Sequence, residues 1–440
     1  MPGVARTGPS ATGGDGGADA DGRRRTAVVG SGVAGLTAAY VLSRSRHVTL
    51  YEADDRLGGH AHTHDITGTD GVTRHVDSGF IVHNRRTYPH LLRLFGELGV
   101  ATQESEMSMS VRCAGCGLEY AGARGPVGLF AQPRNALRGA YLRMLAEVPA
   151  FHRAARRSLA QEPAGAATLG EFLAREGFSA YFRAHFATPL VAAVWSCDAT
   201  TALRYPAVHL FRFLAHHGML SVTGAPAWRT VTGGSRTYVE RIARRLDAVR
   251  TAAPVRAVQR HSDGADVTTH DGATERYHSV VVATHPAQAL ALLADPTPAE
   301  KEVLGAFRYS RNETLLHTDT RLLPRARGAR ASWNYLMPAC STGSAQVRVS
   351  YDMNRLQRLD AAETYIVTLG GEDRVAPERV LARMVYEHPV HTPESVAAQA
   401  RLPELGTAVT AYAGAYHGWG FHEDGCRSGV LAAAALGVRW

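Results

Sequence analysis

Lysine is nearly absent from the sequence, cysteine is scarce and long apolar runs are missing. Lys301 is the only lysine, and arginine supplies the rest of the 48 basic residues behind a net charge of +8. The five cysteines are scattered and odd in number, which argues against a disulfide framework and for a reducing compartment. Because no apolar run approaches the roughly 20 residues of a membrane-spanning helix, we expect a cytoplasmic protein without a membrane span.

The arginine excess has two explanations. In a proteome with biased codon usage, arginine replaces lysine throughout, and the excess then says nothing about function. Alternatively, the charge attracts an anionic partner such as phospholipid headgroups, which would place the protein at the inner face of a membrane. Nucleic acid is not expected as a partner, because no basic-aromatic module or recognition motif accompanies the charge.

The length of 440 residues allows two domains with well-buried cores. Residues 1–24 consist mostly of glycine, alanine, aspartate, serine and proline. Such a segment buries too little apolar surface to offset the entropy of ordering it. We therefore expect a disordered tail over residues 1–24.

The stretch "VVGSGVAGLTAAYVL", residues 28–42, follows three arginines and could be the core of an export signal. However, Gly30, Gly32 and Gly35 interrupt it at fixed spacing, and no convincing cleavage site follows. A nucleotide-binding turn explains more of the residues. "TAVVG" predicts a strand, the glycines form G-x-G-x-x-G, and "LTAAYVLSRS" predicts a buried helix whose N-terminus faces phosphate groups.

A second predicted strand, "HVTLYEA", ends at Glu52, about 20 residues past the glycines. A carboxylate at this place binds ribose hydroxyls and repels a 2′-phosphate, which disfavours NADP. Strand, glycine turn, helix, strand and acid together predict a dinucleotide-binding domain of the Rossmann type.

The residues after Glu52 indicate which dinucleotide binds. Arg56-Leu57-Gly58-Gly59-His60 form an R-x-G-G pattern, which an NAD domain does not need. With the preceding motif, this pattern resembles the flavin-dependent amine oxidase and carotenoid (phytoene) desaturase superfamily. Five later segments resemble the same superfamily in the same order: His75–His83, Trp228–Ile242, Ala253–Arg260, Tyr277–Pro286 and Gly414–Ala433.

"WRTVTGGSRTYV", "LGGHAHT" and "GFHEDG" are most similar to a bacterial subgroup of predicted NAD/FAD-binding oxidoreductases. Members of this subgroup are often encoded beside cyclopropane-fatty-acid-synthase-like methyltransferases. The resemblance therefore implies a lipid-modifying methyltransferase as a partner.

The resemblance implies an α/β fold with a Rossmann-type, glutathione-reductase-like FAD-binding domain and an α+β substrate domain. The FAD domain is expected over residues 25–100, 225–290 and 405–440, and the substrate domain over 101–224 and 291–404. The FAD is expected to be non-covalent, because Cys426 follows the acidic-Gly step instead of preceding it. The residues expected to bind FAD are Gly30, Ser31, Gly32, Val33, Ala34, Gly35, Glu52, Ala53, Arg56, Leu57, Gly58, Gly59, His60, Val255, Glu423, Asp424 and Gly425.

Two further groups of residues have a weaker claim to function. His60, His62 and His64 alternate and share one face of a strand, but they are better explained as parts of the flavin loop and a polar turn. Cys113 and Cys116 form C-x-x-C between two strand-like segments, where Gly115 and Gly117 predict a hairpin turn, and no second pair completes a zinc site. We expect no metal.

Two departures from the amine-oxidase pattern bear on the chemistry. Many members of the superfamily have a lysine that holds a water at the flavin, on the strand after the A-T-x-P turn, and residues 287–295 contain none. Ala415 replaces an acid that binds ribityl hydroxyls, a role that Glu423 or Asp424 would have to fill. The sequence identifies no catalytic side chain, so the chemistry belongs to the flavin.

The sequence thus predicts an FAD-dependent oxidoreductase that removes hydride from a small, apolar substrate, a lipid acyl chain or isoprenoid. Tyr416, Trp419 and Phe421 would form an aromatic wall for it. The amphipathic pattern over residues 133–160 predicts helices that cover the cavity or touch a membrane. One alternative is an amine or amino-acid oxidase, and a second is a non-catalytic FAD- or lipid-binding partner of a methyltransferase.

Overall fold

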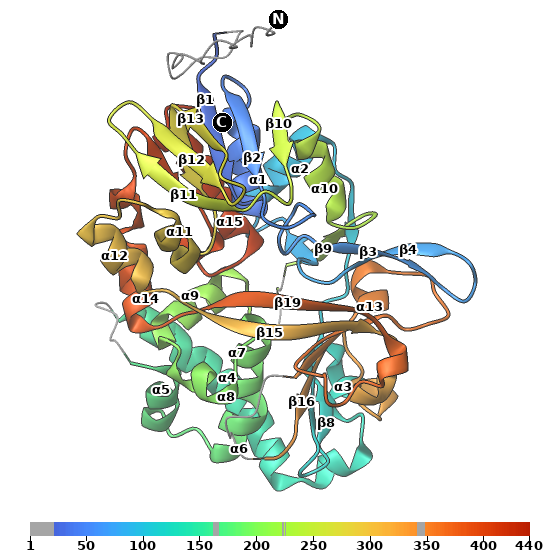
Figure 1. The fold of residues 1–440 in the computed structure, drawn as a ribbon. Helices are drawn as coiled ribbons and strands as arrows, with labels where there is room; N and C mark the ends of the chain where they lie inside the picture. The colour runs from blue at the N-terminus through green and yellow to red at the C-terminus, as the bar shows by residue number, and fades with distance from the viewer. Residues whose placement is uncertain (1–21, 162–166, 222–223, 225, 341–347) are drawn as a thin grey trace, which may run out of the picture.

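The computed structural model describes residues 22–161, 167–221, 224, 226–340 and 348–440 (Figure 1). Residues 1–21 of the tail expected to be disordered lie outside the described residues. The chain has the α/β fold that the sequence predicts, with a parallel sheet near one end and a larger mixed sheet flanked by helices. None of the described helices is long and apolar enough to cross a membrane.

A five-stranded parallel sheet contains the first strand of the chain. In spatial order its strands are β10 (Ala248–Arg250), β2 (His47–Tyr51), β1 (Arg25–Val29), β14 (Ser279–Val282) and β20 (Thr410–Tyr412). Along the chain this order reads third, second, first, fourth, fifth, so the strand order reverses beside β1. That order is typical of doubly wound dinucleotide-binding sheets. The domain boundaries drawn from the sequence stay predictions.

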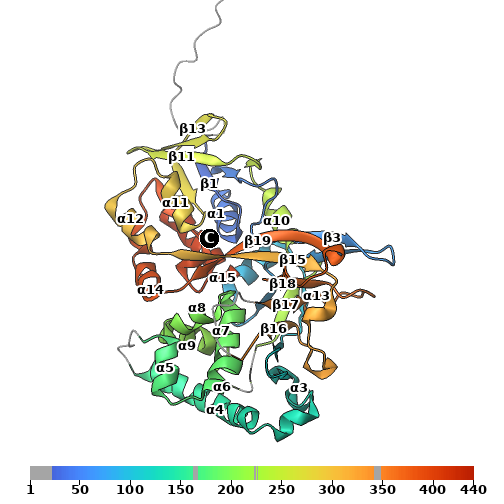
Figure 2. The same cartoon turned by 60° about the horizontal axis from the view of Figure 1, so that its bottom comes forward.

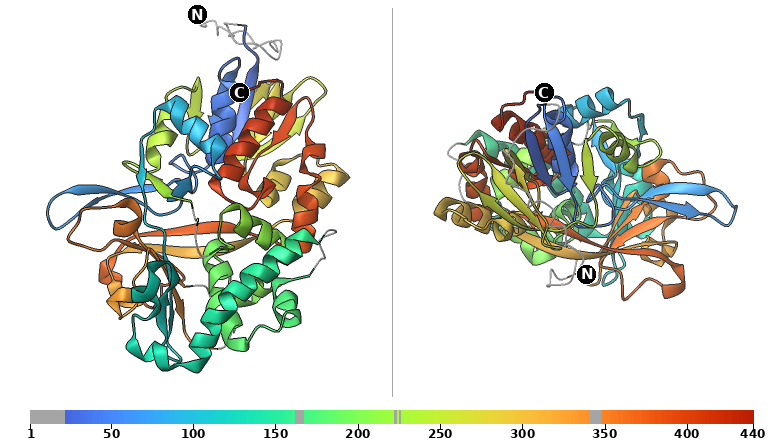
Figure 3. Two further views of the ribbon diagram at one scale, coloured as in Figure 1. Left: turned by 180° about the vertical axis from the view of Figure 1, so that it is seen from behind. Right: turned by 45° about the horizontal axis from the view of Figure 1, so that its top comes forward.

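Both faces of this sheet are covered, which explains why nearly all residues of β1, β2, β14 and β20 are buried. Val28 and Val281 face a core that includes helices α1 (Val33–Leu42), α2 (Pro89–Leu98), α10 (Arg236–Ala243) and α15 (His422–Ala435). Val280 and Val282 face the opposite core, formed with β11 (Val255–Arg260), β12 (Ala265–Thr269), β13 (Thr274–Tyr277), α11 (Pro286–Leu292), α12 (Pro298–Gly305) and α14 (Pro393–Gln399). Seen from behind, α1 and α15 lie side by side (Figure 3).

A seven-stranded mixed sheet forms the middle of the molecule and part of its lower end in Figure 1. In spatial order its strands are β19 (Val380–Val390), β15 (Arg308–His317), β18 (Ile366–Leu369), β17 (Val349–Asp352), β16 (Trp333–Met337), β7 (Met109–Cys113) and β8 (Glu119–Ala121). The long antiparallel pair β15 and β19 passes between the parallel sheet and the lower helices (Figure 1).

Helices α4 to α9 gather on one side of the lower strands (Figure 2). The helices outside the parallel-sheet region are α3 (Gly125–Leu129), α4 (Gly139–Ala160), α5 (Leu169–Arg175), α6 (Ala180–Phe182), α7 (Thr188–Trp195), α8 (Ala199–Arg204), α9 (Ala207–His216) and α13 (Met353–Gln357). The amphipathic pattern over residues 133–160 is confirmed by α4, whose buried positions include Tyr141, Met144 and Phe151.

The segment His75–His83, which resembles a strand of the superfamily, is not one continuous strand, because the chain turns in its middle. Residues up to Asp77 belong to the hairpin β3 (Thr63–Thr67) and β4 (Thr73–Asp77). The chain then joins another sheet, made of β5 (Val82–Asn84), β9 (Trp228–Val231) and β6 (Thr102–Glu104). Gly79 lies at the break, where an added Cβ would be 2.1 Å from the carbonyl oxygen of His60.

Asp77 fastens this hairpin to the glycine-rich segment before α10. Its buried carboxylate accepts hydrogen bonds from the Thr63 hydroxyl at 2.6 Å, and from the Ser235 hydroxyl at 2.8 Å and N–H at 3.0 Å. The Gln357 amide donates a further bond at 3.1 Å. Burial raises the pKa of Asp77 to about 6. One carboxylate therefore joins three segments that are far apart in the chain.

Replacing Asp77 with alanine should lower the free energy of unfolding by about 3 kcal/mol, because several buried donors lose their acceptor. The matched control is Asp65→Ala on the same hairpin. Asp65 is exposed and pairs with Arg236 at 2.7 Å, so its loss should cost less than about 1 kcal/mol. Urea unfolding of both variants measures the difference. Equal losses would contradict the role given to Asp77.

Candidate cofactor and substrate site

The candidate site begins where the order of the parallel strands reverses. β1 ends at Val29, whose carbonyl accepts a hydrogen bond from the N–H of Ala283 at 2.8 Å. Gly30 follows with φ +101°, and an added Cβ would be 2.8 Å from the carbonyl oxygen of Ala283. Only glycine fits this turn. Ligands of doubly wound sheets bind at such a reversal, beyond the carboxyl ends of the strands.

The N-terminus of α1 lies open beyond this turn. Gly35 packs so closely that an added Cβ would be 1.9 Å from the carbonyl oxygen of Gly30, whereas a Cβ on Gly32 would meet nothing within 4 Å. Gly32 is the N-cap residue, and it brings no side chain to the free N–H groups of the first turn. An open helix start without a side-chain cap is a binding site for an anion such as a pyrophosphate.

Glu52 lies directly beside the glycine turn. Its Oε2 accepts hydrogen bonds from the Ser31 N–H at 2.9 Å and the Ser31 hydroxyl at 2.5 Å, and its Oε1 accepts one from the N–H of Asp54 at 3.0 Å. The carboxylate is held at the end of β2, where the sequence analysis places a ligand of ribose. Ala53, the next residue, is exposed.

The R-x-G-G loop packs on the first glycine turn. The N–H of Gly58 donates to the Ser31 carbonyl and hydroxyl oxygens, each at 3.1 Å. A Cβ on Gly59 would be 3.3 Å from the Cα of Gly32. The Arg56 guanidinium donates to the carbonyl of Gly59 at 2.8 Å. The two glycine motifs, 28 positions apart in the chain at their first glycines, thus form one backbone surface.

The segment before Val255 lies beside Glu52 at the carboxyl ends of the parallel strands. The N–H of Ala253 donates to the carbonyl of Glu52 at 2.9 Å, and the N–H of Ala252 donates to the carbonyl of Asp54 at 2.8 Å. Val255 itself is buried at the start of β11. These contacts agree with the expected position of Val255, and its contact with an adenine stays a prediction.

The N-terminus of α15 converges on the N-terminus of α1 (Figure 3). A Cβ on Gly425 would be 2.6 Å from Cγ1 of Val33, and one on Gly429 would be 2.3 Å from the carbonyl oxygen of Ala34. Cys426, between them, is buried and accepts a hydrogen bond from the Thr37 hydroxyl at 3.5 Å. This thiol faces α1, which agrees with a flavin that is not covalently attached.

The carboxylates of Glu423 and Asp424 have structural partners. Glu423 accepts hydrogen bonds from the backbone N–H groups of His90 and Leu91, each at 3.0 Å, and so caps α2. Asp424 accepts from the N–H groups of Trp419 at 3.0 Å and Phe421 at 3.1 Å, and burial raises its pKa to about 6. The side-chain contact expected between these residues and ribityl hydroxyls therefore finds no support in the geometry.

His60 belongs to a group of neutral histidines that no motif in the sequence reveals. The ring of His60 lies 4.9 Å from Tyr386 and 5.3 Å from His388. Burial holds the pKa of His60 well below its usual range and lowers that of His388 to about 4. The partners come from β19, more than 300 positions along the chain, so only the fold brings them together. Both imidazoles are neutral at pH 7.

The comparison of residues 287–295 with a lysine-bearing strand is wrong, because most of this stretch belongs to helix α11. The next strand along the chain is β15, where Asn312 is buried. Its side-chain amide donates to Nδ1 of His388 at 3.0 Å. The polar group that this strand brings to the histidine group is therefore an amide, which carries no charge.

An aromatic wall precedes the start of α15. Phe213 of α9 stacks on Phe421 with ring centroids 4.9 Å apart and lies 5.9 Å from Trp419. The indole N–H of Trp195 in α7 donates to the carbonyl of Trp419 at 3.1 Å. Tyr416, which the sequence analysis placed in this wall, packs instead against Phe307 in the core beyond the parallel sheet.

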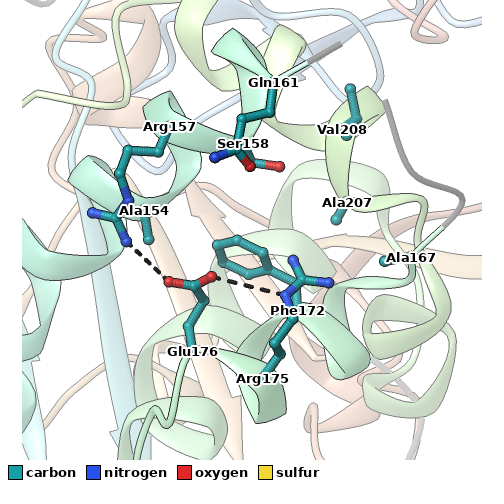
Figure 4. A pocket seen from close by; sticks show the side chains of 10 residues that line it. All are labelled: Ala154, Arg157, Ser158, Gln161, Ala167, Phe172, Arg175, Glu176, Ala207 and Val208. Carbon is teal, nitrogen blue, oxygen red and sulfur yellow. Dashed lines mark hydrogen bonds and ion pairs between the residues drawn. The ribbon is translucent and has the colours of Figure 1, made fainter. Parts of the chain in front are cut away.

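A polar surface pocket lies elsewhere, between α4, α5 and α9 (Figure 4). In it Glu176 pairs with Arg157 at 3.0 Å and with Arg175 at 3.9 Å. None of its lining residues belongs to the predicted cofactor set. Its walls are an ion-paired surface and not part of the site described above.

The residues at the edge of the parallel sheet fit FAD. Gly32 leaves open space, the start of α1 has no side-chain cap, and Oε1 of Glu52, which accepts one hydrogen bond from Asp54, can accept a second. Buried polar atoms of the C-terminal segment also lack a partner among the described residues: His417 Nε2 and Trp419 Nε1. A polar cofactor extended from the glycine turn toward this segment would supply what these groups lack.

Comparison with known proteins agrees with this geometry. The profile of the family described as "Flavin containing amine oxidoreductase" matches residues 33–436. The chain is 29% identical over 279 residues to the "Putative flavin-containing monoamine oxidase AofH" of Mycobacterium tuberculosis, a match covering 61% of this chain. That match spans 58% of the relative's length.

Two solved structures share the fold. Cyclohexylamine oxidase from Brevibacterium oxydans has a TM-score of 0.66 at 18% identity, covering 94% of this chain and 98% of that one. A CLA-producing fatty acid isomerase from P. acnes has a TM-score of 0.64 at 15% identity, covering 93% and 98%. At these identities the likeness shows the fold alone.

Replacing Gly32 with valine should weaken FAD binding at least tenfold, about 1.4 kcal/mol, without unfolding the chain. The backbone at Gly32 is extended, with φ −62° and ψ 173°, and the side chain would enter open space where the pyrophosphate is expected. Titration of apoprotein with FAD measures the affinity, and urea unfolding measures the stability. Gly35→Ala should instead destabilise the apoprotein, because its Cβ would collide with Gly30. Unchanged FAD affinity in Gly32→Val would refute the assignment of Gly32 and the start of α1 to the pyrophosphate site.

Proposed function

The chain belongs to the family of flavin-containing amine oxidoreductases, and we propose that it is an FAD-dependent oxidoreductase acting on a largely apolar substrate, a lipid acyl chain or isoprenoid. The fold alone does not select the substrate, because it is shared by a cyclohexylamine oxidase and a fatty acid isomerase. The choice therefore depends on the side chains near the two converging helix starts.

When bound, FAD supplies a two-electron oxidation by accepting hydride from a substrate carbon. The chain's residues bind and orient the reactants. The start of α1 at Gly32 would hold the pyrophosphate, and Glu52 would bind the ribose. Because the amide of Asn312 donates to Nδ1 of His388, that imidazole carries its proton on Nε2, where it can donate a hydrogen bond. His60 beside it is also neutral, because burial holds its pKa well below the usual range.

The aromatic wall carries the proposal of an apolar substrate. Trp195, Phe213, Trp419 and Phe421 present rings from two helices and the C-terminal segment. The imidazole of His391 next to Trp195 is also neutral, since burial lowers its pKa to about 4. Such a surface excludes water and packs against hydrocarbon, which orients an unactivated C–H bond for hydride removal.

An amine or amino-acid oxidase is the alternative, supported by the similarity to the mycobacterial relative. An amine substrate needs an acid or an aromatic cage to receive its cation. The rings of the wall alone would suit either substrate. The carboxylates of Glu423 and Asp424 beside it are taken by backbone N–H groups, and this supports the apolar substrate.

An exposed apolar patch offers a route for lipid from a membrane surface. Leu137 is 89% exposed and Val127 is 69% exposed, and Phe130 and Leu142 accompany them on the same stretch of chain. Arginines alternate with these side chains along the sequence: Arg124, Arg134, Arg138 and Arg143. Apolar side chains flanked by cations are typical of a face that touches anionic headgroups. A methyltransferase partner stays an expectation of the resemblance.

Leu137→Glu should abolish sedimentation of the protein with anionic vesicles at low salt, because it places a carboxylate at the most exposed apolar position. The control Leu431→Glu changes a leucine that is 57% exposed on α15 and should keep the binding. Raising the ionic strength should release both the wild type and the control, since exposed charges are screened. Equal binding by the two variants would rule out the patch as the contact.

Anaerobic reduction of the flavin tests the substrate class directly. Lipids or isoprenoids taken from cells that lack the protein should bleach the flavin absorbance, because the wall accepts hydrocarbon. A panel of simple primary amines should not. Stopped-flow absorbance under anaerobic conditions records both. Rapid bleaching by amines with no response to any lipid would show the alternative to be right.

A further inference from the structure

Four potential metal ligands from separate parts of the chain meet outside the flavin site. Cys113 and Cys116 belong to the turn between β7 and β8, Cys340 follows the end of β16, and His185 lies in the π-helix η3 (Arg183–Ala187). Their donor atoms all lie within 4.8 Å of one another. No second pair for this C-x-x-C is visible in the sequence, because Cys340 is remote in sequence and reaches the turn only through pairing of β16 with β7.

The spacing of these atoms matches a tetrahedral site. Zinc bonds of about 2.3 Å to sulfur and about 2.0 Å to nitrogen place neighbouring ligand atoms roughly 3.5 to 3.8 Å apart. Sγ of Cys113 lies 3.7 Å from Sγ of Cys340, and Sγ of Cys116 lies 3.6 Å from Nε2 of His185. Two of the distances between ligand atoms therefore already match a tetrahedral zinc site, and the others are no longer than 4.8 Å.

His185 is oriented as a metal ligand. Its Nδ1 lies 3.2 Å from the carbonyl oxygen of Tyr181, one turn earlier. A carbonyl only accepts, so Nδ1 carries the proton and Nε2 presents its lone pair to the sulfur atoms. The ring stacks on Tyr181 with centroids 4.0 Å apart, and the Tyr120 hydroxyl donates to the carbonyl of His185 at 2.7 Å. The imidazole is thus fixed in place and in tautomer.

Two arginines place positive charge beside the turn that carries Cys113 and Cys116. The guanidinium groups of Arg134 and Arg138 donate to the carbonyls of Gly117 at 2.9 Å and Cys116 at 3.0 Å. Three thiolates around a divalent cation carry one net negative charge, which these two arginines would balance.

We propose that Cys113, Cys116, Cys340 and His185 bind one zinc ion in a closed, structural site. Three thiolates and one imidazole are a ligand set that zinc prefers, and four protein ligands leave no position open for substrate. Binding releases the three thiol protons to solvent. The ion would tie the β7–β8 turn and the end of β16 to η3, which leads directly into α7. Since α7 carries Trp195, the site would hold one side of the aromatic wall in place.

Metal analysis and zinc titration test the proposal on the full-length holoprotein, purified reduced and without a histidine tag. The wild type should hold one zinc per chain. Cys340→Ser, chosen because Cys340 is exposed and its loss spares the core, should bind zinc at least about a hundredfold more weakly. Cys197→Ser is the matched control, because Cys197 is a buried thiol outside the cluster, and it should keep the zinc.

Cobalt titration gives a readout that does not depend on zinc affinity. Co²⁺ in the wild type should give the intense ligand-field bands of a tetrahedral thiolate site, at longer wavelength than the flavin absorption. His185→Asn should weaken or shift these bands. Equal zinc binding by the wild type and Cys340→Ser would overturn the proposal. So would a reduced wild type that binds no zinc, or a Cys113–Cys340 disulfide found in its place.

Discussion

The close approach of α1 to the turn before it is the constraint on which the rest of the site depends. Gly35 lies against the carbonyl of Gly30 at a distance that no larger residue permits, and all ten residues of α1 are buried. On its other side, Gly425 and Gly429 let α15 pack equally closely. Small residues on both helices therefore bring two helix starts to one point at the edge of the parallel sheet.

That constraint explains which parts of the site could be predicted from sequence. Two backbone segments can approach this closely only if glycine stands at fixed positions. Those glycines appear in the sequence as the motifs G-x-G-x-x-G and R-x-G-G. The strand before Gly30, the helix after it and the acid at Glu52 lie within a short span, so their order alone specifies the unit. The structure confirms these elements, and Ser31 joins the two motifs by hydrogen bonds to Gly58 and Glu52.

Contacts between distant segments could not be predicted in this way. The sequence shows Glu423 and Asp424 as acids near a helix start, but not that backbone N–H groups of α2 and of the preceding loop occupy them. Likewise, the position of Cys340 and His185 beside the hairpin that carries Cys113 and Cys116 cannot be predicted from the sequence of that hairpin. The break after Asp77 was hidden for the same reason, since it depends on the packing of Gly79 against His60.

The strand order of the parallel sheet determines when the parts of the cofactor site become available during synthesis of the chain. The glycine turn after β1 is among the first described elements to be made, yet β20 and α15, which complete the sheet and the paired helix starts, are among the last. A ribosome-bound chain therefore carries the phosphate-binding turn without the helix that packs against it. The two helix starts can meet only after α15 has been made, so the topology places completion of the cofactor site after synthesis of every strand of the parallel sheet.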